Sequence, residues 1–343
     1  MSAARAAAGP QTTSTAAPLR RASGEANDGH GMVNSDLVVT AVGVVDAEGF
    51  DYRSELGRRG YKYLPTASQY FLAAAKRALA ETGQDALEAV DPERRGAAVG
   101  TNSSADGLHA QMDATVLETS AEDLSPLTAP YFSINLFGSR LAIEHALKGF
   151  NITLTSPRVA GFEALGIGAR SLTLDRADWL LAGATEEALP GSVPGAAASE
   201  AGAVALVLEP AAAVAARGGR ALGRLAVRTG FLPPAAAQGA DGAALARELV
   251  ADALTALGGS LDQGLPVTAV VDDSPVGKAV AAALGEAAER VPAGSGCLAP
   301  VLSVAAALTG EAAGPRAVVT AAAEGNVGVC LVAPAGVEAD NTP

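Results

Sequence analysis

Few side chains in this sequence have the chemistry of a nucleophile or a general base. The 343 residues include only three histidines and two cysteines. Two cysteines cannot build a disulfide framework, and they do not form a zinc-binding pattern. Cys330 lies in the apolar run GVCLV, which is typical of a small buried hydrophobic residue. Any enzyme built on this chain must therefore work with little imidazole and little thiolate.

The three histidines do not form a catalytic or metal-ligating pattern. His30 lies in a segment rich in small and polar residues that we expect to be disordered. His109 and His145 fall on expected helices, where we favour an exposed or structural role over a catalytic one. We predict no bound metal and no organic cofactor.

Two turns carry polar side chains at positions where chemistry is possible. Asp272 and Asp273 follow the apolar run 267–271, and such paired carboxylates suit acid–base chemistry or metal binding. We favour the simpler interpretation that they cap a helix beginning near Pro275. The second turn, Ser156 to Val159, joins an expected strand to an expected helix. Backbone N–H groups at a helix start favour an anion or a nucleophile of lowered pKa, although an ordinary turn explains the pattern equally well.

Charge and motif searches exclude several classes of protein. With 24 Lys and Arg against 37 Asp and Glu, the formal charge of −13 argues against binding nucleic acid. Gly166 and Gly168 lie inside an expected helix and indicate close packing rather than a dinucleotide loop. No apolar run is long enough for a transmembrane helix, and the N-terminal segment lacks the apolar core of a secretory signal. We therefore expect a cytoplasmic protein.

Apolar periodicity predicts strands that alternate with helices, which indicates an α/β fold with mostly buried sheets. The expected strands are 37–45, 96–100, 151–156, 179–184, 203–208, 222–229, 267–271, 316–322 and 327–332. The expected helices are 65–83, 107–118, 131–147, 161–174, 241–257, 278–289 and 297–308. We predict two related halves, 36–210 and 211–335, between a disordered tail at 1–35 and a flexible tail at 336–343.

The order of these segments resembles one superfamily. SEAGAVALVLEPAAAVAARGGRALGRLAV, residues 199–227, is similar to a strand–helix–strand motif of the β-ketoacyl synthase branch of the thiolase fold. ITLTSPRVAGFEALGIGARSLTLDRADWLLAGATEE, residues 152–187, is similar to the strand, elbow and helix that carry the nucleophile in that branch. The resemblance covers about residues 36–334. It implies a thiolase-like fold of two βαβαββ halves that form a layered α/β/α/β/α core.

This chain departs from the family at its three catalytic positions. Arg158 stands where condensing enzymes have the elbow cysteine, and a guanidinium cannot form a thioester. The stretch 272–277, with Asp273 at the degenerate position, replaces the segment with the first histidine. Cys297 stands at or beside the position of the second catalytic histidine. These departures argue against decarboxylative condensation on this chain.

The leading hypothesis is a non-catalytic subunit similar to the chain-length factors of type II polyketide synthases. The resemblance implies a heterodimer with an active β-ketoacyl synthase and a role in shaping the acyl tunnel. Arg158 is a candidate for the interface, although chain-length factors often carry Gln there. The candidates for tunnel or interface contact are Leu108, Met112, Thr115 and Val116, with plain core packing as the alternative.

Two other hypotheses remain open. The first is a repurposed enzyme of the same fold, acyltransferase or hydrolase-like, with Cys297 or Ser274 as the acylated group. The second is a degenerate homodimer that acts as a scaffold for carrier proteins. Acyl carrier proteins are acidic, and an acidic chain repels them. We therefore expect the carrier protein to be engaged indirectly, through the active partner.

Overall fold

A computed structural model of the chain describes residues 37–193, 195–311 and 314–335. The tails predicted at 1–35 and 336–343 lie outside these residues. The strands are β1 (Leu37–Asp46), β2 (Arg95–Gly100), β3 (Asn151–Leu154), β4 (Trp179–Glu186), β5 (Gly202–Pro210), β6 (Gly223–Phe231), β7 (Val267–Val271), β8 (Glu289–Pro292), β9 (Arg316–Ala321) and β10 (Asn326–Pro334). They form one mixed sheet in the order β3-β2-β4-β5-β1-β6-β10-β9-β7-β8.

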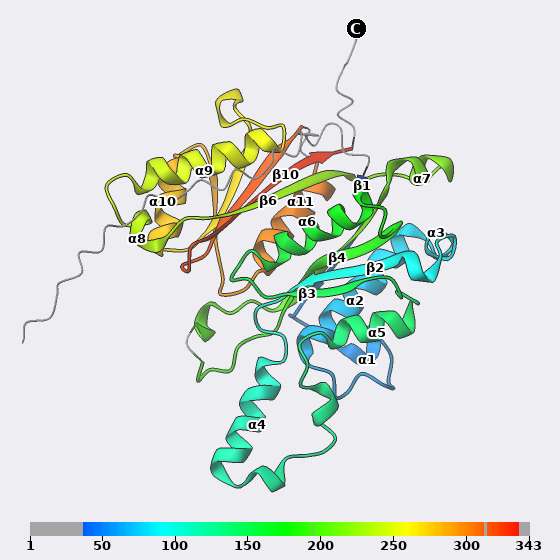
Figure 1. The fold of residues 1–343 in the computed structure, drawn as a ribbon. Coiled ribbons are helices and arrows are strands. Elements are labelled where there is room, and N and C mark those ends of the chain that lie inside the picture. The colour runs from blue at the N-terminus through cyan, green and yellow to red at the C-terminus, as the bar shows by residue number, and fades with distance from the viewer. Residues whose placement is uncertain (1–36, 194, 312–313, 336–343) are drawn as a thin grey trace, which may run out of the picture.

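The helices lie on both faces of this sheet, as Figure 1 shows. They are α1 (Tyr52–Glu55), α2 (Thr66–Thr82), α3 (Gln84–Glu88), α4 (Asp106–Glu118), α5 (Leu136–Glu144), α6 (Ala160–Thr173), α7 (Ala211–Ala216), α8 (Pro234–Ala237), α9 (Gly242–Ala256), α10 (Pro275–Leu284) and α11 (Leu298–Thr309). The predicted α/β class is confirmed. None of the described helices is long and apolar enough to cross a membrane.

Three clusters of buried side chains define the layers. The central cluster joins α6 and α11, with Phe162 and Val301, to strands of both halves. A second cluster packs α2, including Phe71, against the first half of the sheet. A third packs α9 and α10, including Val250 and Val276, against the second half. Helices therefore alternate with sheet in five layers, which agrees with the layered core that we predicted.

Small residues let the layers approach closely. A Cβ at Gly168, on α6, would lie 2.1 Å from Cδ2 of Leu180 on β4. A Cβ at Gly43, on β1, would lie 2.0 Å from the carbonyl oxygen of Ala74 on α2. Gly168 therefore has the packing role that its place inside a helix indicated.

The two halves of the sheet meet at β1 and β6. Among the described residues, these strands share a single register pair, Val39 with Gly223. Beyond that pair β1 continues along β5, and β6 continues along β10. This arrangement lets the sheet fold around the central pair of helices.

The sequence predictions failed at some boundaries. The helix predicted at 131–147 is wrong in its first turn, because α5 begins only at Leu136. The carbonyl of Phe132 instead lies 2.7 Å from the ring Nε2 of His109. The periodicity placed the next helix at 278–289, whereas α10 covers Pro275–Leu284 and begins where the expected helix cap indicated. Its start lies at Pro275 because the Ser274 hydroxyl accepts a hydrogen bond from the Gly277 N–H at 3.1 Å.

The end of α10 and the strand after it were also missed. Gly285 adopts a φ of 73°, which favours glycine, and it ends the helix. Strand β8 then pairs in parallel with β7, and its first residue, Glu289, is the last one that we had assigned to the helix. The run ERVP is short and half polar, so its composition gives little strand signal.

Candidate functional site

The candidate site is the elbow between β3 and α6. Arg158 has a φ of 57° there, in the left-handed region that costs a non-glycine residue about 1 kcal/mol. Its N–H donates to Oδ1 of Asn102 at 3.2 Å, and Nδ2 of Asn102 donates to the Thr155 carbonyl at 3.0 Å. Asn102 lies in the loop after β2, so this loop holds the elbow in its strained conformation.

The Arg158 side chain crosses from the first half of the chain to the second. It is nine-tenths buried, and its Nη1 lies 3.0 Å from Oδ2 of Asp272, which follows β7. The same nitrogen donates to the carbonyl of Ala321, at the end of β9, at 3.1 Å. Nε of Arg158 has no hydrogen-bond partner among the described residues. The elbow position therefore holds a cation that is fixed by the strand ends of the opposite half.

Asp272 is the carboxylate matched to this cation. Burial raises the pKa of Asp272, but hydrogen bonds from Ser274 and the charge of Arg158 outweigh it, and the pKa lies below its usual value. Its neighbour Asp273, which the resemblance places at the degenerate position of the first histidine, is exposed. The helix cap that we assigned to the two aspartates belongs to Ser274. The cap therefore lies one residue after the aspartate pair.

Cys297 lies immediately before α11, with no exposed surface. Burial, followed by the charge of Glu186, raises the pKa of the Cys297 thiol well above its ordinary value. Its backbone N–H donates to Oε1 of Glu186 at 2.8 Å. A thiol that is protonated and enclosed is a poor nucleophile. The second cysteine, Cys330, is fully buried on β10, as its apolar run indicated.

Glu186, at the end of β4, is a residue of this site that sequence reasoning missed. Its carboxylate is fully buried and accepts hydrogen bonds from the N–H groups of Asn102 and Ser103 at 2.9 and 2.8 Å. It also accepts from the Ser103 hydroxyl at 2.6 Å and from Cys297. Glu186 thereby ties the loop behind the elbow to the start of α11. The only sequence signal was a pair of acids that closes the apolar run WLLAGATEE.

The helix that carries the candidate tunnel residues projects from the body (Figure 1). Leu108, Met112 and Thr115 are partly buried, and Val116 is 43% exposed. Helix α4 has no fully buried residue, so plain core packing does not account for these four side chains. The structure does not gather them around Arg158.

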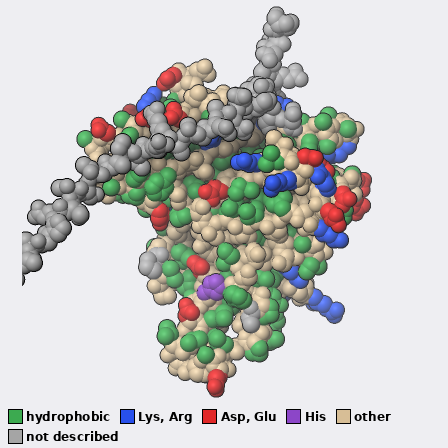
Figure 2. All heavy atoms as spheres, in the orientation of Figure 1, with side chains coloured by type: hydrophobic (Ala, Val, Ile, Leu, Met, Phe, Trp, Pro, Cys, Tyr) green, Lys and Arg blue, Asp and Glu red, His purple; other side chains and the backbone are tan. Residues whose placement is uncertain are grey.

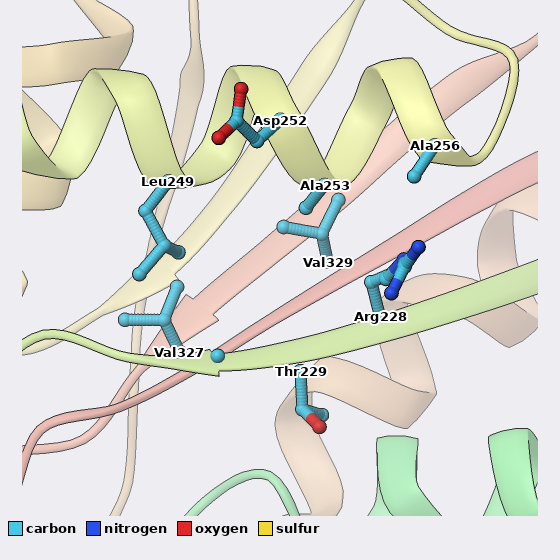
Figure 3. A pocket seen from close by; sticks show the side chains of 9 residues that line it. Arg228, Thr229, Leu249, Asp252, Ala253, Ala256, Val327 and Val329 are labelled. Carbon is cyan, nitrogen blue, oxygen red and sulfur yellow. The ribbon is translucent and has the colours of Figure 1, made fainter. Parts of the chain in front are cut away.

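A separate groove lies on the outer face of the second half. It has a volume of about 300 Å³ between α9 and strands β6 and β10. Figure 3 shows Arg228 and Asp252 at its sides and Val327 and Val329 on the strand behind. This groove is therefore distinct from the elbow, which lies on the other side of the same sheet.

Comparison with known proteins identifies the family of the chain. Residues 20–218 match the family model "Beta-ketoacyl synthase, N-terminal domain". The chain belongs to the β-ketoacyl synthase family. It is 26% identical over 141 residues to the 3-oxoacyl-[acyl-carrier-protein] synthase 2 of Vibrio cholerae, and 33% identical over 119 residues to that of Rhizobium meliloti. The matches cover 41% and 34% of this chain but only 34% and 28% of these relatives.

Solved ketosynthase structures share the fold. The ishigamide ketosynthase/chain length factor superposes with a TM-score of 0.69 at 21% identity, over 88% of this chain and 99% of that one. A type II polyketide synthase ketosynthase, in complex with its acyl-carrier protein and bound to the hexaketide, superposes with a TM-score of 0.68 at 17% identity, over 87% and 99%. The thiolase-like β-ketoacyl synthase fold is therefore confirmed.

Proposed function

We propose that this chain is a non-catalytic ketosynthase-like subunit, of chain-length-factor type, that pairs with an active β-ketoacyl synthase. The observation that carries the proposal is the ion pair between Arg158 and Asp272 at the elbow. A condensing enzyme needs a thiolate there, and an arginine that is always protonated cannot be acylated. The elbow is thus a structural joint in this chain.

The other candidate nucleophiles are engaged elsewhere. Cys297 is fully buried, and its pKa is raised by burial and by Glu186. The Ser274 hydroxyl accepts the Gly277 N–H and so caps α10. The Cys297 thiol is enclosed and protonated, and the Ser274 hydroxyl is held in a helix cap, which favours the pairing role over a repurposed acyl-transfer enzyme.

The outer edge of the first half supplies a pairing surface. Strand β3 ends the sheet, so one side of its backbone is open to another strand. Figure 2 shows hydrophobic side chains, in green, on the lower lobe of the molecule. The projecting segment 106–135 exposes large apolar side chains. They include Leu117 at 85%, Leu127 at 62% and Phe132 at 58% exposed. Exposed apolar groups of this size indicate a protein interface.

The partner expected on this surface is an active, Cys-containing ketosynthase subunit, in a role that limits acyl-chain length. Among the solved relatives, one is described as a ketosynthase/chain length factor and another as a ketosynthase with its acyl-carrier protein. We expect the acyl carrier protein to reach this chain only through that partner. The formal charge of −13 supports this arrangement, since acidic surfaces repel an acidic carrier.

Co-expression tests the proposal. The chain is produced with a Cys-containing ketosynthase that is encoded beside it, and only one of the two carries an affinity tag. We expect an equimolar complex that takes up an acyl label on the ketosynthase alone. Self-pairing of this chain, together with acyl transfer to it from a carrier protein, would overturn the proposal.

A further inference from the structure

The position of α4 depends on the contacts at its N-terminal end, where the helix joins the body of the molecule. No residue of α4 is fully buried, and its far end exposes Leu117. Two contacts near the base, from the His109 ring to the Phe132 carbonyl at 2.7 Å and from the Ser104 hydroxyl to the Ile134 carbonyl at 3.4 Å, join the helix to the rest of the projecting segment. They hold the segment together but do not orient it on the sheet.

The residue at the N-cap of α4 does not cap the helix with its side chain. Its N-cap, Ala105, has no side-chain acceptor and adopts a φ of 75°. The N-cap of α2, Pro65, likewise makes no side-chain hydrogen bond. The first N–H groups of a helix need acceptors, and an uncapped start in a buried place is costly.

Glu187 supplies the acceptor for both helices. Its Oε1 accepts the Gly107 N–H of α4 at 2.9 Å, and its Oε2 accepts the Ala67 N–H of α2 at 3.2 Å. The residue is only 5% exposed. A carboxylate placed at two helix starts also has a favourable interaction with both helix dipoles.

The backbone of Glu187 is fixed by the loop that leads into α4. Its N–H donates to the Ser103 hydroxyl at 2.9 Å, and Ser103 is also held by Glu186. The titratable groups facing Glu187 are Asp106, whose charge raises the Glu187 pKa further, His109, which lies near Asp106, and Tyr70 of α2, whose own pKa is raised by burial and by the charge of Glu187. Burial is the largest cause of that raised pKa.

We propose that Glu187 is a positioning residue, which sets the direction of α4 relative to α2 by capping both helices with one carboxylate. Because Glu186 next to it holds the loop behind the elbow, the two adjacent acids connect α4 to the elbow. The consequence for partner binding rests on the proposed function, but the orientation of α4 does not.

Spin labels test the orientation directly. Cys297 and Cys330 have no exposed surface, so labels introduced with Leu117→Cys on α4 and Ala80→Cys on α2 react selectively. We expect one narrow distance distribution in the otherwise unchanged chain and a broad one after Glu187→Ala. Glu187→Gln, which keeps one acceptor oxygen, restores part of the narrow distribution. An unchanged distribution in Glu187→Ala overturns the proposal.

Glu209→Gln is the matched control. Glu209 is 1% exposed and accepts hydrogen bonds from Thr40 and Arg217, on an element that does not carry α4. The control should lower stability without broadening the distance distribution, and broadening there too would show general loosening and overturn the specific role of Glu187.

Capture of the tagged ketosynthase separates the positioning role of Glu187 from the proposed use of α4 in pairing. We expect about tenfold weaker capture with Glu187→Ala, which corresponds to the loss of one helix cap. A broadened distribution with unchanged capture would support the positioning role and contradict the use of α4 in pairing. Weaker capture with an unchanged distribution would overturn the positioning role.

Discussion

Arg158 and Asp272 form an ion pair that joins the two halves of the chain at the elbow, with 3.0 Å between Nη1 and Oδ2. One residue begins the turn into α6 and the other follows β7. The pair lies where the family resemblance places a nucleophile and a histidine. A charge pair in a mostly buried place contributes little net stability while intact, but losing one partner is costly.

Asp272→Asn should therefore lower the free energy of unfolding by about 2–4 kcal/mol, because the guanidinium stays buried without its counter-charge. Arg158→Met should cost less, since Asp272 is a quarter exposed and water can reach it. Urea denaturation of both single variants and the double variant gives the coupling energy. We expect at least about 1 kcal/mol of coupling, and additive losses would show that the pair is not a unit.

Two glycines in α6 should respond oppositely to alanine. Gly168→Ala should destabilise the protein by about 1–3 kcal/mol, because the new methyl group overlaps Leu180, which is itself fully buried. Gly166→Ala places its methyl 3.6 Å from Val227 and should stabilise the helix by about 0.5–1 kcal/mol. Thermal unfolding measures both, and equal shifts would contradict the packing of α6 on β4.

Neither thiol should react in the folded protein. Cys297 and Cys330 are fully buried, and burial raises the pKa of each thiol. Titration with a chromogenic disulfide should find no thiol under native conditions and both in denaturant. Rapid reaction of one native thiol that disappears in Cys297→Ser would show that Cys297 is accessible, and it would revive acyl-transfer chemistry on that residue.

Glu187 should make the protein less stable as pH rises. Burial raises its folded pKa above the unfolded value near 4.5, so the folded state binds a proton more tightly. This stabilisation is fully present below the unfolded pKa and is lost as pH rises through the folded pKa. The stability of the unchanged chain relative to Glu187→Gln should therefore fall over that window in pH-dependent urea denaturation. A difference that does not vary with pH would contradict the buried carboxyl.

Much of the fold could be predicted because its strands are long and apolar. The run LVVTAVGVV became β1, and WLLAGATEE became β4, since fully buried strands need near-continuous hydrophobic residues. Apolar periodicity missed the short strand β8 and the first turn of α10, although the polar turn before Pro275 indicated where that helix begins. Their existence depends on pairing with β7 and on the Ser274 cap, which are tertiary and local contacts that apolar periodicity does not register.

The residues of the site likewise differ in whether the sequence could predict them. Arg158 was found because it stands inside a strand–turn–helix segment that is recognisable from its neighbours. Glu186 and Glu187 were not found, because their hydrogen-bond partners lie 80 or more positions earlier in the chain and, for Glu186, also at Cys297. Their roles depend on which groups the fold brings to the end of β4.

The place of β1 in the sheet also constrains synthesis on the ribosome. Strand β1 pairs along its length with β5, which ends at Pro210. At a synthesis rate of roughly 5–20 residues per second, β5 is completed on the order of 10–30 s after β1 and α2. During this interval the apolar face of α2 has no finished sheet to cover it. Nascent chains that stop before β5 should therefore be targets for chaperones and proteases, whereas chains that extend past it should be protected.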